Sequence, residues 1–203
     1  MNKNKFDGNL YNLLKQEEYI EGQLLSKEVI ENLEHSNIEF INVDIYNCSF
    51  VHCVLDKAYF KDVVIDNCDF TATDFNNSSF KNVTFNECKL NHSLLKNSFF
   101  ENVKFTNCVC KEIDFYNSKF KNFETIDCNF GYSQLSDSKF TSVKFTRTNL
   151  ELANFSKTSL KQVDFSSCNI DGIIAYQADF KGAIFNTEQA ITFLKLLGIK
   201  IKD

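Results

Sequence analysis

The chain has 203 residues, a formal net charge of −5 and a pI near 5.3. This acidic balance argues against a general nucleic-acid-binding role, because domains of that kind present a basic surface. No apolar run approaches the length of a membrane span, and Met1 leads into a polar, lysine-containing segment without a signal peptide, so we expect a cytoplasmic protein with no membrane association.

The first 37 residues predict an N-terminal helical cap. Apolar residues recur at helical spacing in two stretches, with Gly22 as a breaker between them and Ser26 as the N-cap of the second helix. The apolar residues are Leu10, Leu13 and Leu14 in the first stretch and Val29, Ile30 and Leu33 in the second. Such a cap would cover the open strand edge of the following domain, which otherwise invites aggregation.

From Phe40 to Phe185 an apolar residue returns at every fifth position. The thirty centre positions hold eighteen Phe, six Leu and three Ile, and the others are Cys110, Thr125 and Ala175. A period of five fits neither a helix, with about 3.6 residues per turn, nor a strand, with a period of two. The repeating unit is therefore a short extended segment followed by a corner, wound into a solenoid over residues 38–186.

The residues two positions before each centre carry a second period of twenty. Three series show it: Val43, Val63, Val83 and Val103; Cys48, Cys68, Cys88, Cys108 and Cys128; and Ala58, Ser78, Ser98 and Ser118. Residues twenty apart thus share an environment, which requires four five-residue sides per coil and a square cross-section. We name the sides after the centres of one coil: the Phe60, Ile65, Phe70 and Phe75 sides.

Each centre and the residue two before it are predicted to point inward, because side chains alternate along an extended segment. Where the centre shrinks to Thr125, its companion grows to Phe123, which conserves volume. The last outward position is Asn in ten places, and Asn tolerates turn dihedrals and can stack in ladders, so these positions are the predicted corners. The rod would be roughly 36 Å long at a strand spacing of about 4.8 Å.

Residues 187–203 predict a C-terminal helix and a short strand. Thr187 is the expected N-cap with Glu188 in the first turn, and Gly198 is expected to end the helix. The apolar residues of this segment are Ala190, Phe193, Leu194, Leu197, Ile199 and Ile201. Two interpretations stay open: the segment plugs the last coil, or it contacts a second copy of the chain.

The repeat consensus is a small residue or Val, a polar residue, Phe or Leu, a polar residue, and Asn, Asp or Lys. Over residues 38–185 it resembles that of the pentapeptide-repeat proteins, and the resemblance implies an all-β solenoid, a right-handed quadrilateral β-helix. The segment from Phe185 to Ile201 is similar to the C-terminal signature of the Qnr-type members. Those are cytoplasmic bacterial proteins that bind type II topoisomerases and protect them from fluoroquinolones.

The Qnr resemblance implies further expectations. DNA gyrase or topoisomerase IV would be the protein partner, and the C-terminal helix would form a two-fold homodimer. Many Qnr proteins need loops that project from the helix for full protection of gyrase, whereas the register from 38 to 185 has no insertion. Topoisomerase binding is therefore the firmer expectation, and protection from the drug the weaker one.

No cofactor, metal site or catalytic group is expected. The eight cysteines form no Cys-x-x-Cys pair, so we expect them to pack as small apolar residues in a reducing compartment. His52 and His92 share a column, but Ala72 separates them by roughly 9–10 Å, too far to bind one metal. Nucleotide-binding and hydrolase motifs are absent and the acids are dispersed, so we expect no enzyme.

Charge differs between the sides. The Ile65, Phe70 and Phe75 sides carry fourteen acids against eight bases, a net of six negative charges, whereas the Phe60 side carries seven lysines against four acids. The resemblance implies that such a rod imitates duplex DNA, yet duplex DNA of about 36 Å carries roughly 21 charges. Mimicry would therefore depend on rod shape and local contacts. The candidate partner-binding residues are Asp44, Asp66, Glu87, Glu124, Asp127, Leu94 and Phe99.

The lysine row leaves two interpretations open. Direct nucleic-acid binding is the less favoured one, because the chain is acidic overall. The other is protection against edge pairing and aggregation. For the whole protein we expect a non-enzymatic interaction protein that binds and modulates gyrase or topoisomerase IV, with fluoroquinolone protection as one outcome; the alternative is a rigid scaffold or adaptor with an unrelated protein partner.

Overall fold

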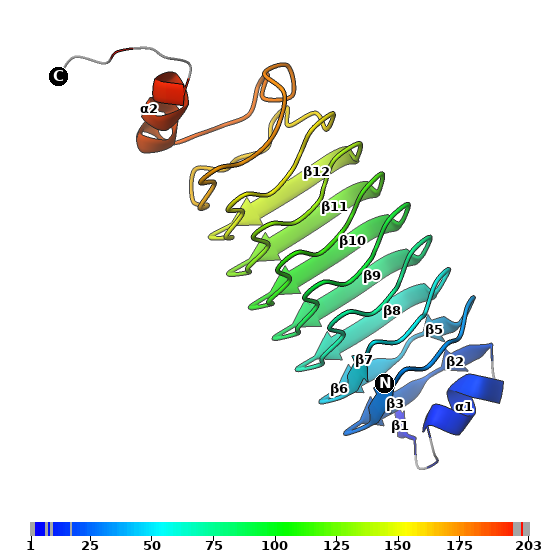
Figure 1. Ribbon diagram of the computed structural model, residues 1–203. Coiled ribbons are helices and arrows are strands. Elements are labelled where there is room, and N and C mark those ends of the chain that lie inside the picture. The colour runs from blue at the N-terminus through cyan, green and yellow to red at the C-terminus, as the bar shows by residue number, and fades with distance from the viewer. Residues whose placement is uncertain (1–2, 7, 9, 17, 197–199, 201–203) are drawn as a thin grey trace.

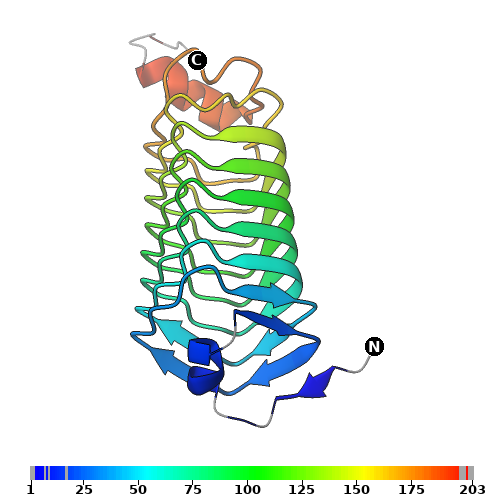
Figure 2. The ribbon, with the colours of Figure 1, turned by 90° about the vertical axis from the view of Figure 1, so that its right-hand side faces the viewer.

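The computed structural model describes residues 3–6, 8, 10–16, 18–196 and 200, and shows a straight rod of stacked coils (Figure 1). Seen from the adjacent direction, the coils lie directly above one another around a common bore (Figure 2). From residue 19 onward strand pairing is parallel and advances by twenty residues, so that one column runs from Phe60 through Phe80, Phe100 and Phe120 to Phe140. The expected four-sided β-helix is confirmed.

The strands lie mainly on the Phe60 and Ile65 sides. The regular part of the rod contains five eight-residue strands: β8 (Tyr59–Asp66), β9 (Ser79–Asn86), β10 (Phe99–Thr106), β11 (Lys119–Ile126) and β12 (Lys139–Thr146). Shorter strands precede them: β1 (Asn4–Lys5), β2 (Tyr19–Glu21), β3 (Gln23–Ser26), β4 (Val29–Glu31), β5 (Glu39–Ile41), β6 (Asp44–Tyr46) and β7 (Ser49–Val51). The two helices are α1 (Leu10–Gln16) and α2 (Thr187–Leu196).

The bore is filled by the centre residues and their companions, as the alternation predicts. Residues 65, 85 and 105 lie on one side and are at most 1% exposed. Phe rings of successive coils stack: Phe85 and Phe105 have ring centroids 4.4 Å apart, and Phe60 and Phe80 4.9 Å. Because parallel in-register pairing brings equivalent positions together, a ring whose column continues with Phe gains a stacking partner in both neighbouring coils, as Phe80 does with Phe60 and Phe100.

The exchange of volume between Thr125 and Phe123 is also confirmed. Phe123 is buried beside the small centre, and its ring lies 4.9 Å from Phe120 and 5.6 Å from Phe105. The Thr125 hydroxyl is buried with the hydroxyl of Thr148, 2.7 Å away. The aromatic ring has moved by two positions along the strand, which leaves the bore filled.

The corners share one backbone conformation. Every fifth residue from Lys27 to Gln162 has a positive φ, whichever side chain it carries. Asn predominates there because it adopts the left-handed region at lower cost than most residues. Its amides form ladders between coils: Asn122 donates to Asn102, and Asn102 to Asn82, each over 2.9 Å. These ladders stabilise corners that would otherwise be strained.

The N-terminal segment departs from the prediction. The first helix is confirmed as α1, whose Leu10 and Leu14 are fully buried. The second helix is wrong, because residues 19–31 form β2, β3 and β4 and pair in parallel with β5, β6 and β7. Ile20, Leu25 and Ile30 continue the five-residue series of buried centres, and coil-to-coil pairing takes precedence over local helical spacing. The solenoid therefore begins near residue 19 instead of residue 38.

The start of α2 is also shifted from the prediction. Its N-cap is Asn186, not Thr187: the Asn186 side-chain oxygen accepts from the backbone N–H of Gln189, and the Gln189 side chain accepts from the backbone N–H of Asn186. This reciprocal pair is a capping box, in which two otherwise unpaired N–H groups are satisfied. The predicted helix end at Gly198 and the strand through Ile199 and Ile201 lie outside the described residues.

Candidate functional site

The five candidate acids lie on the Ile65 side and on its corner with the Phe70 side. Asp44, Asp66 and Glu124 flank the centres of this side, and Glu87 and Asp127 occupy corners with positive φ. The rigid coil spacing holds them in columns parallel to the rod axis. The expected grouping of these acids on one side is therefore present, although they are spread over several coils.

Three of these acids are neutralised by ion pairs. Asp44 binds Lys3, Glu124 lies 3.3 Å from the Lys104 ammonium group, and Asp127 receives a two-point contact from Arg147, each bond 2.7 Å long. The hydrogen bonds from Arg147 lower the pKa of the Asp127 carboxyl group below its usual range. These pairs reduce the negative potential that a partner would meet on this side.

Asp66 and Glu87 have no ion pair within the described part of the chain. Among the described residues, the Asp66 carboxylate accepts only a long hydrogen bond of 3.5 Å, from the side-chain amide of Asn86. Burial, followed by the charges of Asp44 and Asp66, raises the pKa of Tyr46 between them. Among the five candidate acids, the uncompensated negative charge is therefore concentrated at Asp66 and Glu87.

A shallow hollow of about 200 Å³ lies next to Glu87, at the corner between the Ile65 and Phe70 sides. Its lining residues are Asn47, Cys48, Ser49, Asn67, Cys68, Asp69, Glu87 and Lys89. The repeat pattern did not predict this hollow.

The lysines of the Phe60 side are unevenly compensated. Glu101 lies 2.6 Å from Lys121 and 3.8 Å from Lys81, and the hydrogen bond from Lys121 lowers the pKa of its carboxyl group. Five other lysines of this side form no ion pair with any described residue: Lys61, Lys119, Lys139, Lys161 and Lys181. Four of these five lie between residue 119 and the C-terminal end of the rod.

The candidate apolar pair lies on two different sides of the rod. Leu94 is half-buried on the Phe75 side between Asp74 and Asp114 in the neighbouring coils. Phe99 is 37% exposed on the Phe60 side, where Ser79 and Lys119 are its neighbours in register. Each residue is thus bordered by polar groups in its own column.

The C-terminal end of the bore is only partly closed. Phe193 of α2 packs on Phe180 and Phe185, with ring centroids 5.1 and 4.9 Å away, which agrees with its expected plugging role. An apolar groove of about 520 Å³ remains beside these rings. Ala190 and Leu194 line it, and Leu194 is 38% exposed. The other expected dimer contacts, Leu197, Ile199 and Ile201, lie outside the described residues.

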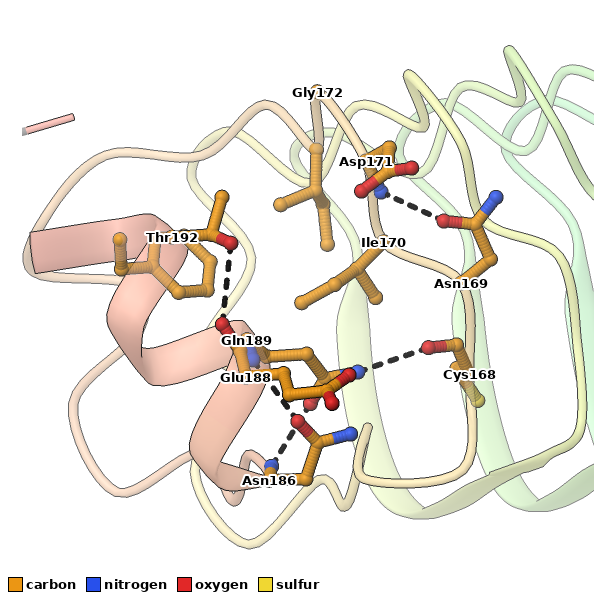
Figure 3. A pocket seen from close by; sticks show the side chains of 11 residues that line it. Cys168, Asn169, Ile170, Asp171, Gly172, Asn186, Glu188, Gln189 and Thr192 are labelled. Carbon is orange, nitrogen blue, oxygen red and sulfur yellow. Dashed lines mark hydrogen bonds between the residues drawn. The ribbon is translucent and has the colours of Figure 1, made fainter. Parts of the chain in front are cut away.

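Gln189 joins α2 to the last coil through its side chain (Figure 3). Its amide nitrogen donates to the backbone oxygens of Phe165 and Cys168, both over 2.9 Å. In the regular coils such a carbonyl group accepts a hydrogen bond from the next coil: the backbone oxygen of Cys128, two coils before Cys168, accepts from the N–H of Asn149. Gln189 therefore replaces hydrogen bonds that a further coil would supply.

A polar pocket of about 270 Å³ lies between α2 and this last coil (Figure 3). Asp171 and Glu188 belong to its lining, together with Asn169, Ile170 and Thr192. The five-residue repeat does not predict this pocket. The signal that was present is the Asn-x-x-Gln pattern at the start of α2, which is typical of a capping box.

All eight cysteines are buried free thiols, as their packing role requires. Burial raises the pKa of Cys53, Cys110 and Cys168, so these thiols are protonated near neutral pH. His92 lies 3.3 Å from Glu112. Among the described residues no group of His, Cys, Asp and Glu side chains is arranged to hold a metal ion, and no helix is long and apolar enough to cross a membrane.

A family model for the pentapeptide repeat region matches residues 58–126, 78–155 and 94–174. Together these matches span residues 58–174, more than half of the chain. The chain belongs to the pentapeptide-repeat family. In this pentapeptide-repeat protein the five-residue period of the sequence recurs in the structure, both in the positive φ of the corner residues and in the stacked Phe rings of the bore.

A solved structure shares this fold. Full-length QnrB1, a plasmid-mediated fluoroquinolone resistance protein, is 16% identical with a TM-score of 0.50, covering 87% of this chain and 100% of its own. HetL, involved in heterocyst differentiation regulation in the cyanobacterium Nostoc sp. strain PCC 7120, is a further match, 13% identical with a TM-score of 0.28, covering 87% and 94%. No curated protein sequence matches the chain.

Proposed function

We propose that this pentapeptide-repeat protein is a non-enzymatic interaction protein that binds bacterial DNA gyrase or topoisomerase IV and modulates its activity, with relief of fluoroquinolone poisoning as one outcome. The observation that carries the proposal is the agreement in fold with QnrB1 over the whole of that chain. The Qnr-like sequence of the C-terminal segment supports it further. A cytoplasmic location agrees with the eight free cysteines, since reducing compartments keep thiols unpaired.

The Ile65 side is the proposed contact surface, with Asp66 and Glu87 as its main charges. Both are free of ion pairs within the described structure, whereas Asp44, Glu124 and Asp127 already have basic partners. A partner that binds DNA has a positively charged channel, and uncompensated acids on a rigid rod are attracted to it. In this proposal the rod shape and the charges of Asp66 and Glu87 together take the place of the DNA phosphates in the partner's channel.

A supercoiling assay with purified gyrase, with and without ciprofloxacin, tests the proposal. We expect micromolar protein to change supercoiling or to restore it in the presence of the drug. The double variant Asp66→Asn/Glu87→Gln should shift the effective concentration upward at least several-fold, whereas Glu151→Gln, an acid on the Phe70 side, should not. If wild-type protein at micromolar concentration changes neither supercoiling nor drug inhibition, the proposal fails.

We also propose that the C-terminal segment forms a homodimer contact, with Leu194 at its centre. Leu194 is exposed on the rim of the apolar groove, and contiguous apolar surface of this kind is typical of a protein contact. Phe193 is a poorer probe, because it packs on Phe180 and Phe185 within the same chain. Leu194→Asp should give monomers in light scattering at moderate salt, and an unchanged dimer would refute this contact.

A rigid scaffold or adaptor with an unrelated protein partner is the second candidate. It is favoured by the uniform corners, which bear no projecting loop between Lys27 and Gln162. The neutralised acids of the Ile65 side favour it as well. The same gyrase assay separates the two functions, because a scaffold of this kind would leave supercoiling unchanged.

A further inference from the structure

The last coil of the Phe70 side ends with two unpaired backbone N–H groups. In the coils from Phe50 to Leu152, the centre residue of this side and the corner residue two positions later donate to backbone oxygens of the next coil. The N–H of Leu150, for example, donates to the backbone oxygen of Asn169 over 2.7 Å. Ile170 and Gly172 occupy these positions in the last coil, and neither N–H has an acceptor among the described residues. Residues 169–172 therefore form an open strand edge.

Helix α2 stands beside this edge without closing it. The Gln189 amide satisfies the Cys168 carbonyl group at the start of the edge, over 2.9 Å. Beyond that contact, the polar pocket of about 270 Å³ separates α2 from Ile170, Asp171 and Gly172 (Figure 3). Pockets for drug-sized ligands measure about 300–1,000 Å³, so this smaller pocket suits a short stretch of extended chain.

An amide ladder on the same side also ends at this edge. The side-chain amide of Asn169 donates to Asn149, and that of Asn149 donates to Asn129, over 3.0 and 3.1 Å. The side-chain oxygen of Asn149 therefore has two donors, Asn169 and the backbone N–H of Glu151. The side-chain oxygen of Asn169 has one donor among the described residues, the backbone N–H of Asp171. One acceptor position of the ladder is thus left for an amide group from outside the chain.

The side chains around the edge determine what a bound segment must carry. Ile170, Ile173 and Phe193 form the apolar part of the pocket lining, so a residue stacked on Ile170 is expected to be apolar. Asp171 and Glu188 add two negative charges to the same lining, and no described basic group forms an ion pair with either. These charges disfavour an anion and favour a Lys or Arg side chain beside Asp171.

We propose that this edge binds an extended segment of another protein as an additional parallel strand, with the residue order Asn, apolar, Lys or Arg. The backbone oxygens of its first and third residues accept from the N–H groups of Ile170 and Gly172, as in the regular coils. The Asn continues the ladder at Asn169, the apolar side chain covers Ile170, and the cation lies beside Asp171. In recognition by strand addition the backbone gives affinity and alternate side chains give specificity. This contact is independent of the one proposed for gyrase on the Ile65 side.

Titration of the full ¹⁵N-labelled chain with a short peptide tests the site by NMR. The probe is the acetylated and amidated peptide Gly-Asn-Leu-Lys-Gly. It should shift the backbone N–H signals of Ile170 and Gly172 and leave those of β9 unchanged. We expect a dissociation constant on the order of 0.1–1 mM, because the contact is small. The scrambled peptide Gly-Lys-Asn-Leu-Gly has the same composition and should bind more weakly, since it places Leu beside Asp171.

Charge exchange tests the contact with Asp171. Asp171→Asn should weaken binding of the peptide about threefold or more, as the loss of an exposed ion pair predicts. Asp171→Lys should weaken it further and should restore binding to a peptide that carries Glu in place of Lys. Glu151→Gln neutralises the acid at the equivalent position one coil earlier and should have less effect than Asp171→Asn. Asp171 is exposed, so these variants should keep the fold, which circular dichroism checks.

Three results would overturn the proposal. One is that millimolar peptide leaves the N–H signals of Ile170 and Gly172 unshifted, which would mean that water alone satisfies this edge. Another is that the scrambled peptide binds equally well, or that Asp171→Asn and Glu151→Gln weaken binding to the same extent. The third is binding that appears only in the variant Lys200→Glu/Ile201→Asp, which would assign the edge to the chain's own C-terminal segment instead of another protein.

Discussion

The regular middle of the rod and its C-terminal end are built from the same repeat but differ in what surrounds each coil. Between β8 and β12 every coil has neighbours above and below, the strands are eight residues long, and the centre residues Phe85 and Phe105 are at most 1% exposed. After Gln162 the regular corners end, and Phe180 and Phe185 are only partly buried. The helix α2 closes part of this end (Figure 1).

This difference shows that the repeat sequence alone does not bury its own centre residues. A coil hides its rings only when another coil or a cap stacks upon it, which is the nearest-neighbour behaviour of solenoid proteins. At the N-terminal end α1 supplies Leu10 and Leu14, both fully buried. At the C-terminal end Phe193 and the Gln189 amide supply less cover. Stability should therefore fall from the middle toward the C-terminal end.

The largest expected effect is the loss of a ring from the middle. Phe105→Ala removes a buried ring stacked on Phe85 and should lower the free energy of unfolding by about 3–5 kcal/mol. Phe180→Ala should cost about 1–2 kcal/mol, because part of this ring already faces solvent. Urea denaturation followed by circular dichroism measures both. Equal losses would contradict the difference between the two regions.

A smaller effect is expected from the cap. Gln189→Ala removes two hydrogen bonds to backbone carbonyls of the last coil and the capping-box bond from the Asn186 N–H, and should cost about 1–3 kcal/mol. Thr192→Ala, one turn further along α2 on its exposed face, should cost less than about 0.5 kcal/mol. Hydrogen exchange should increase for Gln189→Ala in residues 165–186 and remain unchanged in β9 and β10. Uniform acceleration along the rod would argue against a local cap.

The corners of the middle should respond to side-chain chemistry. Asn102→Ala removes two amide ladder bonds and places Ala at φ 54°, so we expect a loss of about 1–2 kcal/mol in urea denaturation. Asn102→Gly should cost less than Asn102→Ala, since glycine adopts this conformation freely. The reverse order of the two variants would contradict the argument from backbone conformation.

The smallest effect concerns thiol reactivity, which reports local opening without changing the fold. Cys168 is 8% exposed and lines the pocket beside α2, whereas Cys108 in the middle is 1% exposed. Burial raises the pKa of Cys168, so its reactive thiolate form should increase as the pH rises above neutral. Ellman's reagent should modify Cys168 first, and the remaining thiols only in denaturant. Simultaneous modification of all eight would show that the two regions open together.

Most of the fold could be predicted from the sequence because its two periods act everywhere in the same way. The five-residue period assigned the inward residues, and the twenty-residue period assigned the neighbours. The helix predicted after Ser26 is wrong because Val29, Ile30 and Leu33 fit a helical face as well as they fit the repeat. The sequence also contains the competing five-residue pattern at Ile20, Leu25 and Ile30. Pairing of β2, β3 and β4 with the next coil favours strands over the helix.

The candidate surfaces were harder to predict, because outward residues are not constrained by packing. The twenty-residue period predicts that Asp127 and Arg147 lie one coil apart. It does not predict that their side chains form the ion pair seen in the structure. Long flexible side chains choose among several neighbours, so ion pairs depend on details that a period does not contain. The role of Gln189 depends on a helix that turns back over the last coil, and no repeat position describes it.

Because its corners are identical, the rod can lose or gain residues without rotating its sides only in units of one whole coil of twenty residues. Because each coil repeats after twenty residues with the same corner conformation, removing residues 83–102 would join two coils whose sides still coincide. Removing five residues would instead rotate all later coils by a quarter of a turn relative to the earlier ones. The lysine row of the Phe60 side would then continue a different side of the rod. Evolution of such a chain can therefore change its length by whole coils without disturbing which surface faces a partner.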